Sequence, residues 1–142
     1  MKKILAITPS KCIDCKKCQV ACSYKHHESF EPERARIKVQ TQGEEDGIPV
    51  VCLQCEEAAC LSVCPTGALQ PHNENGVIEL DESKCIRCRA CVAACPFGNI
   101  TYEVNSNKVQ KCDLCKGEPM CAVFCPTGAI AYIDVPDDGY NV

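Results

Sequence analysis

Four groups of closely spaced cysteines carry the chemistry that this sequence offers. The first and third groups have the spacing C-x2-C-x2-C-x3-C, the second has C-x2-C-x4-C-x3-C, and the fourth has C-x2-C-x5-C-x3-C. Together they use all sixteen cysteines of the 142-residue chain: Cys12, Cys15, Cys18 and Cys22; Cys52, Cys55, Cys60 and Cys64; Cys85, Cys88, Cys91 and Cys95; Cys112, Cys115, Cys121 and Cys125. Thiols this dense either bind soft metal ions or form disulfides, and their spacing distinguishes the two.

The spacing C-x2-C-x2-C-x3-C is typical of bacterial ferredoxins, in which the fourth cysteine ligates the other cluster of a pair. A tight loop places the first three thiolates at three corners of one cubane. The C-x3-C step is about one helical turn, or roughly 6 Å of rise, so the fourth sulfur reaches a neighbouring cubane. Pro65, Pro96 and Pro126 follow the fourth cysteine and end the short helix there. Ser23 stands at this place in the first group, so we expect helix or loop to continue.

Zinc and disulfides are the alternatives to iron-sulfur clusters. The N-terminus has two lysines and too few apolar residues before Pro9 for the roughly 7 to 15 of a secretory signal. No run approaches the roughly 18 apolar residues of a membrane span. We therefore expect a cytoplasmic protein, in which thiols stay reduced. Zinc sites pair two C-x2-C units across a longer spacer, whereas here a third cysteine follows at once, so the spacing favours iron-sulfur clusters.

The elements around the cysteines are predicted to be small. The chain has no Trp, four Tyr and three Phe, so inorganic centres must replace much of an ordinary core. Short β-branched runs predict strands, and turn residues predict hairpins at Asn75-Gly76 and at Asn105 to Asn107. An inserted hairpin is expected at about 34–51, as a partner-facing element or an inert surface loop. The predicted strands are Ile4 to Thr8, Ile37 to Thr41, Ile48 to Val51, Gly76 to Leu80, Thr101 to Val104 and Ile130 to Val135.

From about residue 4 to residue 134 the chain resembles the four-cluster, ferredoxin-like iron-sulfur subunits of multi-subunit oxidoreductases. These include subunits of formate dehydrogenases, dimethyl sulfoxide reductase, CO dehydrogenase, hydrogenase complexes and tungsten aldehyde oxidoreductases. The motifs that carry the resemblance are CIDCKKCQVAC, CLQCEEAACLSVCPTGA, CIRCRACVAACPFG and CDLCKGEPMCAVFCPTGA. It implies one α+β, ferredoxin-like domain over 1–142, made of two pseudo-symmetric bacterial ferredoxin halves. The halves are expected at about 1–22 with 99–135, and at 52–98.

The resemblance also implies which cysteines share a cluster. The spacing indicates that each fourth cysteine crosses over, and the family pairs the first group with the fourth and the second with the third. Four 4Fe-4S clusters follow, with the sixteen cysteines as iron ligands. The implied sets are Cys12, Cys15, Cys18 and Cys125; Cys22, Cys112, Cys115 and Cys121; Cys52, Cys55, Cys60 and Cys95; Cys64, Cys85, Cys88 and Cys91.

The function implied by the resemblance is electron transfer without catalysis. The chain would relay single electrons between a catalytic subunit of the tungsten or molybdenum-pterin or Ni-Fe-S type and a further electron carrier or flavoprotein subunit. The short chain favours a soluble complex of the tungsten aldehyde oxidoreductase or CO dehydrogenase type. The alternative is a diffusible polyferredoxin that serves several enzymes, and the sequence leaves open whether copies self-assemble.

Other function classes lack their signatures. The formal net charge is −4 and no basic patch is interleaved with aromatic residues, which argues against nucleic acid. There is no dinucleotide fingerprint and no phosphate loop. His26, His27 and His72 stand in polar segments expected to be loops, without a nucleophile motif, so we expect no catalytic residue. The lysines that precede the first cysteine of three groups either compensate cluster charge or are solvated: Lys11, Lys84 and Lys111.

Overall fold

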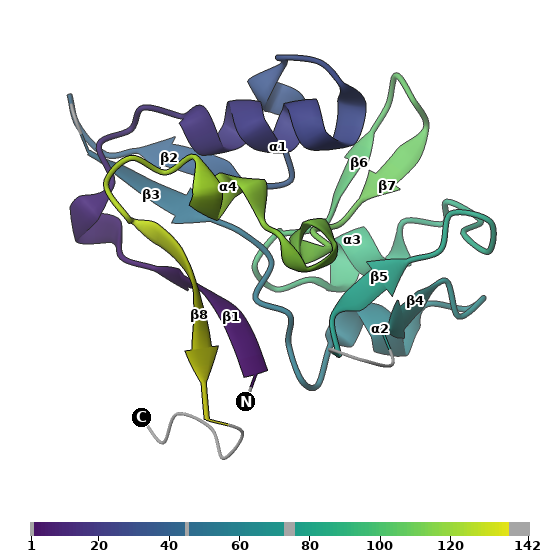
Figure 1. The fold of residues 1–142 in the computed structure, drawn as a ribbon. Coiled ribbons are helices and arrows are strands. Elements are labelled where there is room, and N and C mark those ends of the chain that lie inside the picture. The colour runs from purple at the N-terminus through teal and green to yellow at the C-terminus, as the bar shows by residue number, and fades with distance from the viewer. Residues whose placement is uncertain (1, 45, 73–75, 137–142) are drawn as a thin grey trace. The chain divides into compact units, whose positions relative to one another are not determined.

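The structure is a computed structural model that describes residues 2–44, 46–72 and 76–136. The chain divides into two compact units (Figure 1). Unit 1 comprises Met1–Val50 and Pro119–Val142, and unit 2 comprises Val51–Glu118. Within the described residues, no helix has both the length and the apolar composition of a membrane span.

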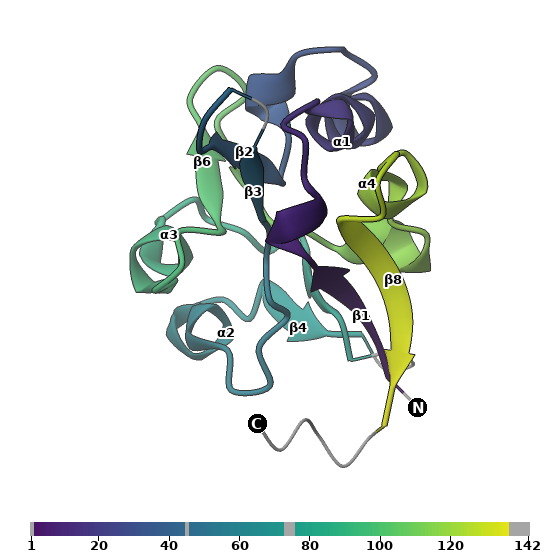
Figure 2. The ribbon, with the colours of Figure 1, turned by 90° about the vertical axis from the view of Figure 1, so that its left-hand side faces the viewer.

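Unit 1 is built on a strand pair that joins the two ends of the chain. Six residues of β1 pair antiparallel with six residues of β8, from Lys2 opposite Val135 to Ile7 opposite Ile130 (Figure 2). The helix α1 packs against α4, and the hairpin β2–β3 follows a short 3-10 turn at Pro32–Arg34. The elements are β1 (Lys2–Ile7), α1 (Lys17–His27), β2 (Lys38–Thr41), β3 (Gly47–Val50), α4 (Met120–Val123) and β8 (Ile130–Val135).

The described residues of unit 2 form two small hairpins, two short α-helices and a 3-10 turn at Leu114–Gly117. β4 pairs with β5 and β6 with β7, each over three residues, and α2 packs against α3. The elements are α2 (Ala59–Val63), β4 (Leu69–Pro71), β5 (Ile78–Leu80), α3 (Ala90–Ala94), β6 (Thr101–Glu103) and β7 (Lys108–Gln110). The buried core holds Ala58, Cys60, Leu69, Ile78, Cys91, Ile100 and Val109, so two of its seven members are thiols.

The predicted α+β class with short helices and hairpins is confirmed. The strand predicted at Ile130 to Val135 has those bounds, and the others differ by one or two residues at an end. The hairpin that turns at Asn105 to Asn107 is also confirmed, and Asn107 takes the left-handed backbone conformation, φ 53°. The turn predicted at Asn75 lies outside the described residues.

The first cysteine group has a longer helix than the others. α2 and α3 end at the residue before the fourth cysteine, whereas α1 continues past Cys22 to His27. The continuation predicted from Ser23 is therefore confirmed, because no proline interrupts the helix. His26 and His27 lie in the last turn of α1, so their predicted loop was wrong. Basic side chains at this end complement the negative end of the helix dipole.

Candidate metal centres

The backbone of every cysteine group contains residues in the left-handed conformation. The second residue after the first cysteine has a positive φ in all four groups: Asp14 (58°), Gln54 (49°), Arg87 (60°) and Leu114 (54°). This conformation costs an L-residue roughly 1 to 2 kcal/mol. Strain of this kind persists only where the surrounding structure or a bound group compensates for it. The left-handed conformation repeated in all four cysteine groups therefore indicates a bound group at each of them.

Three cavities are each lined by four cysteines drawn from two groups. We call them the Cys12 site, the Cys52 site and the Cys64 site. Four thiolates around one cavity form the ligand set of a 4Fe-4S cubane, so the residues present fit that cofactor. The lining cysteines are Cys12, Cys15, Cys18 and Cys125; Cys52, Cys55, Cys60 and Cys95; Cys64, Cys85, Cys88 and Cys91.

These cavities bring together three of the four cysteine sets that the resemblance implies. The fourth set is Cys22, Cys112, Cys115 and Cys121, and its residues are divided between the two units. The assignment of iron to individual cysteines stays a prediction for all four sets.

Thiolate repulsion and burial control the pKa values at these sites. Burial raises the pKa of Cys18 to about 12. The amide of Gln19 opposes this rise, and the neighbouring Cys15, Cys125 and Cys12 each add a smaller increase. Burial likewise raises the pKa of the Cys60 and Cys91 thiols, with contributions from the other cysteines of their sites. Only the thiolate ligates metal, so iron binding must displace these protons.

The turn after the fourth cysteine supplies hydrogen-bond donors to sulfur. In two groups the amide four residues later donates to the cysteine Sγ, from Ala68 to Cys64 at 3.3 Å and from Asn99 to Cys95 at 3.4 Å. Burial alone would raise the pKa of Cys64, but the amides of Leu69, Thr66 and Ala68 outweigh it and lower the pKa to about 7. Amide donors thus stabilise the thiolate, and they tune the potential of a bound cluster.

A glycine shapes each of these turns. Gly67, Gly98 and Gly128 stand three residues after the fourth cysteine with φ of 67°, 66° and 72°. We expect Gly98→Ala to destabilise the holo-protein by about 1 to 2 kcal/mol through backbone strain alone, because nothing lies within 4 Å of the added Cβ. The measurement is the rate at which cluster absorbance bleaches in denaturant. Gly43→Ala, also in open space but without a positive φ, is the matched control, and equal rates would contradict the prediction.

The insertion after the first group takes over the role of the missing turn. Cys22 lacks the following Pro-x-Gly turn, and its Sγ instead accepts from the amide of Arg36 at 3.2 Å. The side chain of Gln19 fixes the insertion on α1, since its Oε1 accepts from the amide of Val39 at 2.8 Å and its Nε2 donates to the Pro32 carbonyl at 3.2 Å. The insertion is therefore part of the cysteine site, a role that the sequence analysis missed. The missing proline after Cys22 was the available signal.

The three lysines that precede cysteines have different surroundings. Lys11 and Lys84 are exposed, as expected for solvated side chains. Lys111 is 3% exposed and lines the Cys52 site together with Gln54. The sequence could not separate them, because all three have the same local pattern of lysine before cysteine.

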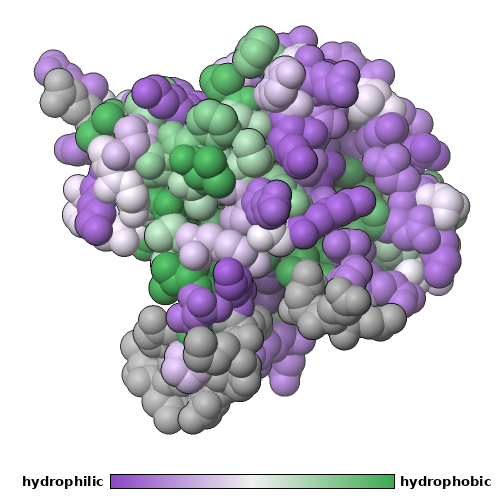
Figure 3. All heavy atoms as spheres, viewed as in Figure 1, coloured by the Kyte–Doolittle hydropathy of each residue, from purple (hydrophilic) through white to green (hydrophobic). Residues whose placement is uncertain are grey.

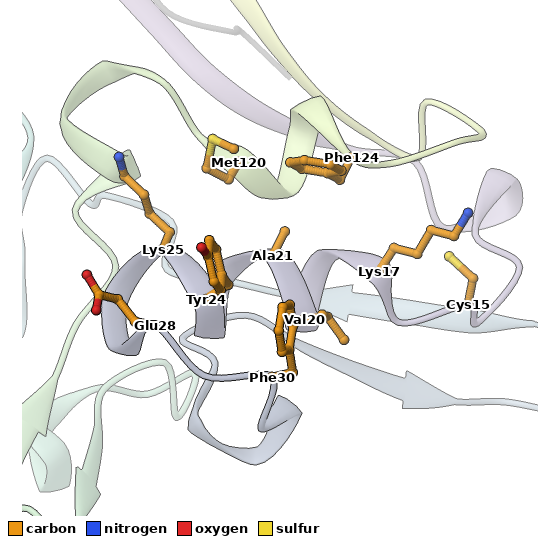
Figure 4. Close-up of a pocket in the computed structure, with 10 residues that line it drawn as sticks. All are labelled: Cys15, Lys17, Val20, Ala21, Tyr24, Lys25, Glu28, Phe30, Met120 and Phe124. Atoms are coloured by element: carbon orange, nitrogen blue, oxygen red, sulfur yellow. The ribbon is translucent and has the colours of Figure 1, made fainter.

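An apolar groove of about 510 Å³ lies between α1 and α4 in unit 1 (Figure 4). Residues of α1 at helical spacing form one wall, and Met120 and Phe124 form the other. Tyr24 stacks on Phe30 with ring centroids 5.1 Å apart, yet the two residues are 54% and 71% exposed. A hydrophobic patch covers this part of the surface (Figure 3). Cys15 and Lys17 lie at one end of the groove, and Lys25 and Glu28 lie at the other.

Comparison with known protein families identifies the kind of domain. Residues 44–135 match a family described as 4Fe-4S dicluster domain, and residues 11–68 match a second family with the same description. Two dicluster matches together with sixteen cysteines fit four 4Fe-4S clusters, which confirms the cofactor predicted from the spacing.

Several known proteins are similar to most of this chain. A Pyrococcus furiosus protein named aliphatic sulfonate oxidoreductase, polyferredoxin-like subunit, is 39% identical over 85% of this chain and 70% of its own length. The Escherichia coli putative electron transport protein YsaA is 36% identical over 95% of this chain and 92% of its own. The beta subunit of NADH-dependent phenylglyoxylate dehydrogenase from Aromatoleum evansii is 34% identical over 91% of this chain, which spans only 30% of that subunit.

Solved structures show the same fold. A chain of the active site complex BamBC of benzoyl coenzyme A reductase, determined with zinc, matches with a TM-score of 0.54 and 28% identity over 96% of this chain and 83% of its own. The same complex with benzoyl-CoA gives a TM-score of 0.54 and 29% identity over 92% and 78%. The ferredoxin-like fold expected from the sequence is thereby confirmed.

Proposed function

The chain belongs to the 4Fe-4S dicluster domain family, and on that premise we propose that it relays single electrons within an oxidoreductase complex. The favoured complex is of the tungsten aldehyde oxidoreductase or CO dehydrogenase type, with a catalytic subunit on one side and another electron carrier or flavoprotein on the other. The observation that carries this proposal is the convergence of four cysteines on each of three cavities. When bound, a 4Fe-4S cluster accepts and releases one electron at a time.

The geometry of unit 2 suits relay between neighbouring clusters. Cys60 is the second residue of α2 and belongs to the Cys52 site. Cys64 directly follows α2 and belongs to the Cys64 site. α3 does the reverse, with Cys91 in the Cys64 site and Cys95 in the Cys52 site. Two packed helices thus each link both sites over one turn, roughly 6 Å of rise. Clusters bound at two sites linked in this way would be close enough to exchange electrons directly.

A dedicated subunit is favoured over a diffusible polyferredoxin. The relatives named above as subunits of sulfonate oxidoreductase and phenylglyoxylate dehydrogenase support the first reading. We expect the native protein to elute from an anaerobic sizing column with a larger catalytic subunit. A single peak at the mass of one chain would contradict the subunit role and favour the diffusible carrier. The cytoplasmic location expected from the sequence stays a prediction.

We propose further that the α1–α4 groove receives an apolar segment of the catalytic subunit flanked by carboxylates. Exposed aromatic side chains around a groove are typical of protein interfaces rather than of free surfaces. Lys17 lies at one end of the groove, and Lys25 lies at the other end together with Glu28, so the charge of the groove lining is positive on balance. This favours carboxylates beside the bound apolar segment. The exposed Cys15 lies in the groove wall and belongs to the Cys12 site, so a segment bound there would lie beside a cluster ligand.

We expect Phe124→Asp to weaken binding of the co-purifying catalytic subunit at least tenfold, because the new charge would be buried in an apolar contact. Phe124 is half exposed, so the chain should retain its iron content and spectra. Val104→Asp in unit 2, at a residue that is 78% exposed, is the matched control and should leave the complex intact. Binding is measured by titrating the variant chain into isolated catalytic subunit. Equal affinities for the two variants would exclude the groove as the docking surface.

A further inference from the structure

Lys111 places a positive charge in the interior of unit 2. Among the lysines and arginines whose side chains the structure describes, it is the one that is buried, with 3% of its surface exposed. Its Nζ donates to the carbonyl oxygens of Ile78 at 2.7 Å and Cys112 at 3.0 Å, and to Gln54 Oε1 at 3.2 Å. An ammonium group has three N–H donors, so these oxygens satisfy all of them. Burial of a cation is costly, and the three hydrogen bonds compensate for the water that Lys111 has lost.

Gln54 fixes the position of this ammonium group. Its Oε1 also accepts from the amide of Ile78 at 3.1 Å, and its Nε2 donates to the Cys112 carbonyl at 2.7 Å. Gln54 itself lies between Cys52 and Cys55 with a φ of 49°. The network therefore connects the second cysteine group, β5 and the start of the fourth cysteine group. A charge held by three elements keeps its place when an electron arrives.

The ammonium group faces the Cys52 site. Lys111 lines that cavity with Cys52, Cys55, Cys60 and Cys95. The wall of this cavity therefore contains a buried cation as well as four thiols.

The other two cavities have basic residues that water can reach. Arg89 lines the Cys64 site and Lys16 lines the Cys12 site, and both are exposed. Water and salt screen an exposed charge, whereas a charge in the interior acts through a lower dielectric. A basic residue therefore has a larger electrostatic effect at the Cys52 site than at the other two sites.

We propose that Lys111 raises the reduction potential of the cluster at the Cys52 site above that of the cluster at the Cys64 site. Reduction adds one electron, delivered by the redox partner, and hence one negative charge to the site. A buried cation stabilises that reduced form relative to the oxidised form. An electron that enters unit 2 will then reside at the Cys52 site. This inference rests on the proposed function, since it requires clusters at both sites.

The test is a redox titration of the anaerobically purified holo-chain, followed by EPR. Lys111→Gln keeps two N–H donors for the same oxygens and removes the charge. We expect the equilibrium constant for one-electron reduction of one cluster to fall at least tenfold, which lowers its reduction potential by about 59 mV or more. Lys111→Arg keeps the charge, so the reduction potential of that cluster should stay close to its wild-type value. Lys84→Gln, an exposed lysine that also precedes a cysteine, is the matched control and should change nothing.

Four clusters with unchanged potentials in Lys111→Gln would overturn the role of Lys111 and leave the proposed function intact. A wild-type chain without any 4Fe-4S signal would overturn the proposed function instead. If Lys111→Gln does not retain its clusters, Lys111→Met decides the matter, because it removes the charge and keeps an unbranched side chain of similar length. That variant should also lower the potential of one cluster, and an unchanged titration would count against the proposal.

Discussion

Cys91→Ala will remove one 4Fe-4S cluster and weaken a second. Wild-type protein prepared without oxygen should contain about sixteen iron and sixteen acid-labile sulfide per chain, because four cubanes carry four of each. The variant should contain at most about twelve of each, or about fifteen iron if a three-iron cluster survives at the Cys64 site. Cys91 is 8% exposed and belongs to the buried core of unit 2. Its loss also leaves a gap in α3, which carries Cys95 of the Cys52 site.

Iron and sulfide analysis with EPR measures the loss. Ala93→Ser on the same helix is the matched control, since Ala93 is exposed and should leave all clusters in place. Sixteen iron in purified Cys91→Ala would show that Cys91 is not a ligand. Zinc in place of iron in the wild-type chain would contradict the cofactor itself, and with it every prediction about potentials.

Local sequence patterns predicted the elements that depend on near neighbours. The strand Ile130–Val135 is rich in β-branched residues between Gly128 and Pro136, and its bounds follow from that pattern alone. The hairpin at Asn105 to Asn107 is also local, because two short runs pair across one turn. The cysteine spacing predicted the C-x3-C helices for the same reason, since one turn of helix needs only its own residues.

Features that depend on distant residues could not be predicted in this way. The amide of Arg36 donates to Cys22 from an insertion that Gln19 also binds, and no repeat in the sequence marks those three residues as partners. Lys111 is buried while Lys84 is exposed, although each precedes a C-x2-C pair, because Gln54 and Ile78 surround one and solvent surrounds the other. The groove joins Tyr24 and Phe30 to Phe124, almost a hundred positions further along the chain.

Removal of iron will unfold unit 2 more completely than unit 1. The strands of unit 2 have three residues each, and α2 and α3 have five, far below the roughly 12 to 15 at which an isolated helix is even marginal. Two of the seven core residues are cluster-site cysteines, so the apolar core without metal is too small to order the unit. Unit 1 retains an 11-residue helix and a six-residue strand pair, which depend less on the cofactor.

Hydrogen exchange before and after anaerobic chelation measures this difference. Amides of the β6–β7 hairpin should lose nearly all protection, while those of β1 and β8 should keep part of theirs. Iron, sulfide and a thiol reductant should restore the original pattern, because binding energy at these sites is also folding energy. The asymmetry distinguishes a fold organised by metal from one that only carries it. Equal protection of β6 and β7 with and without iron would show that Leu69, Ile78, Ile100 and Val109 suffice as a core.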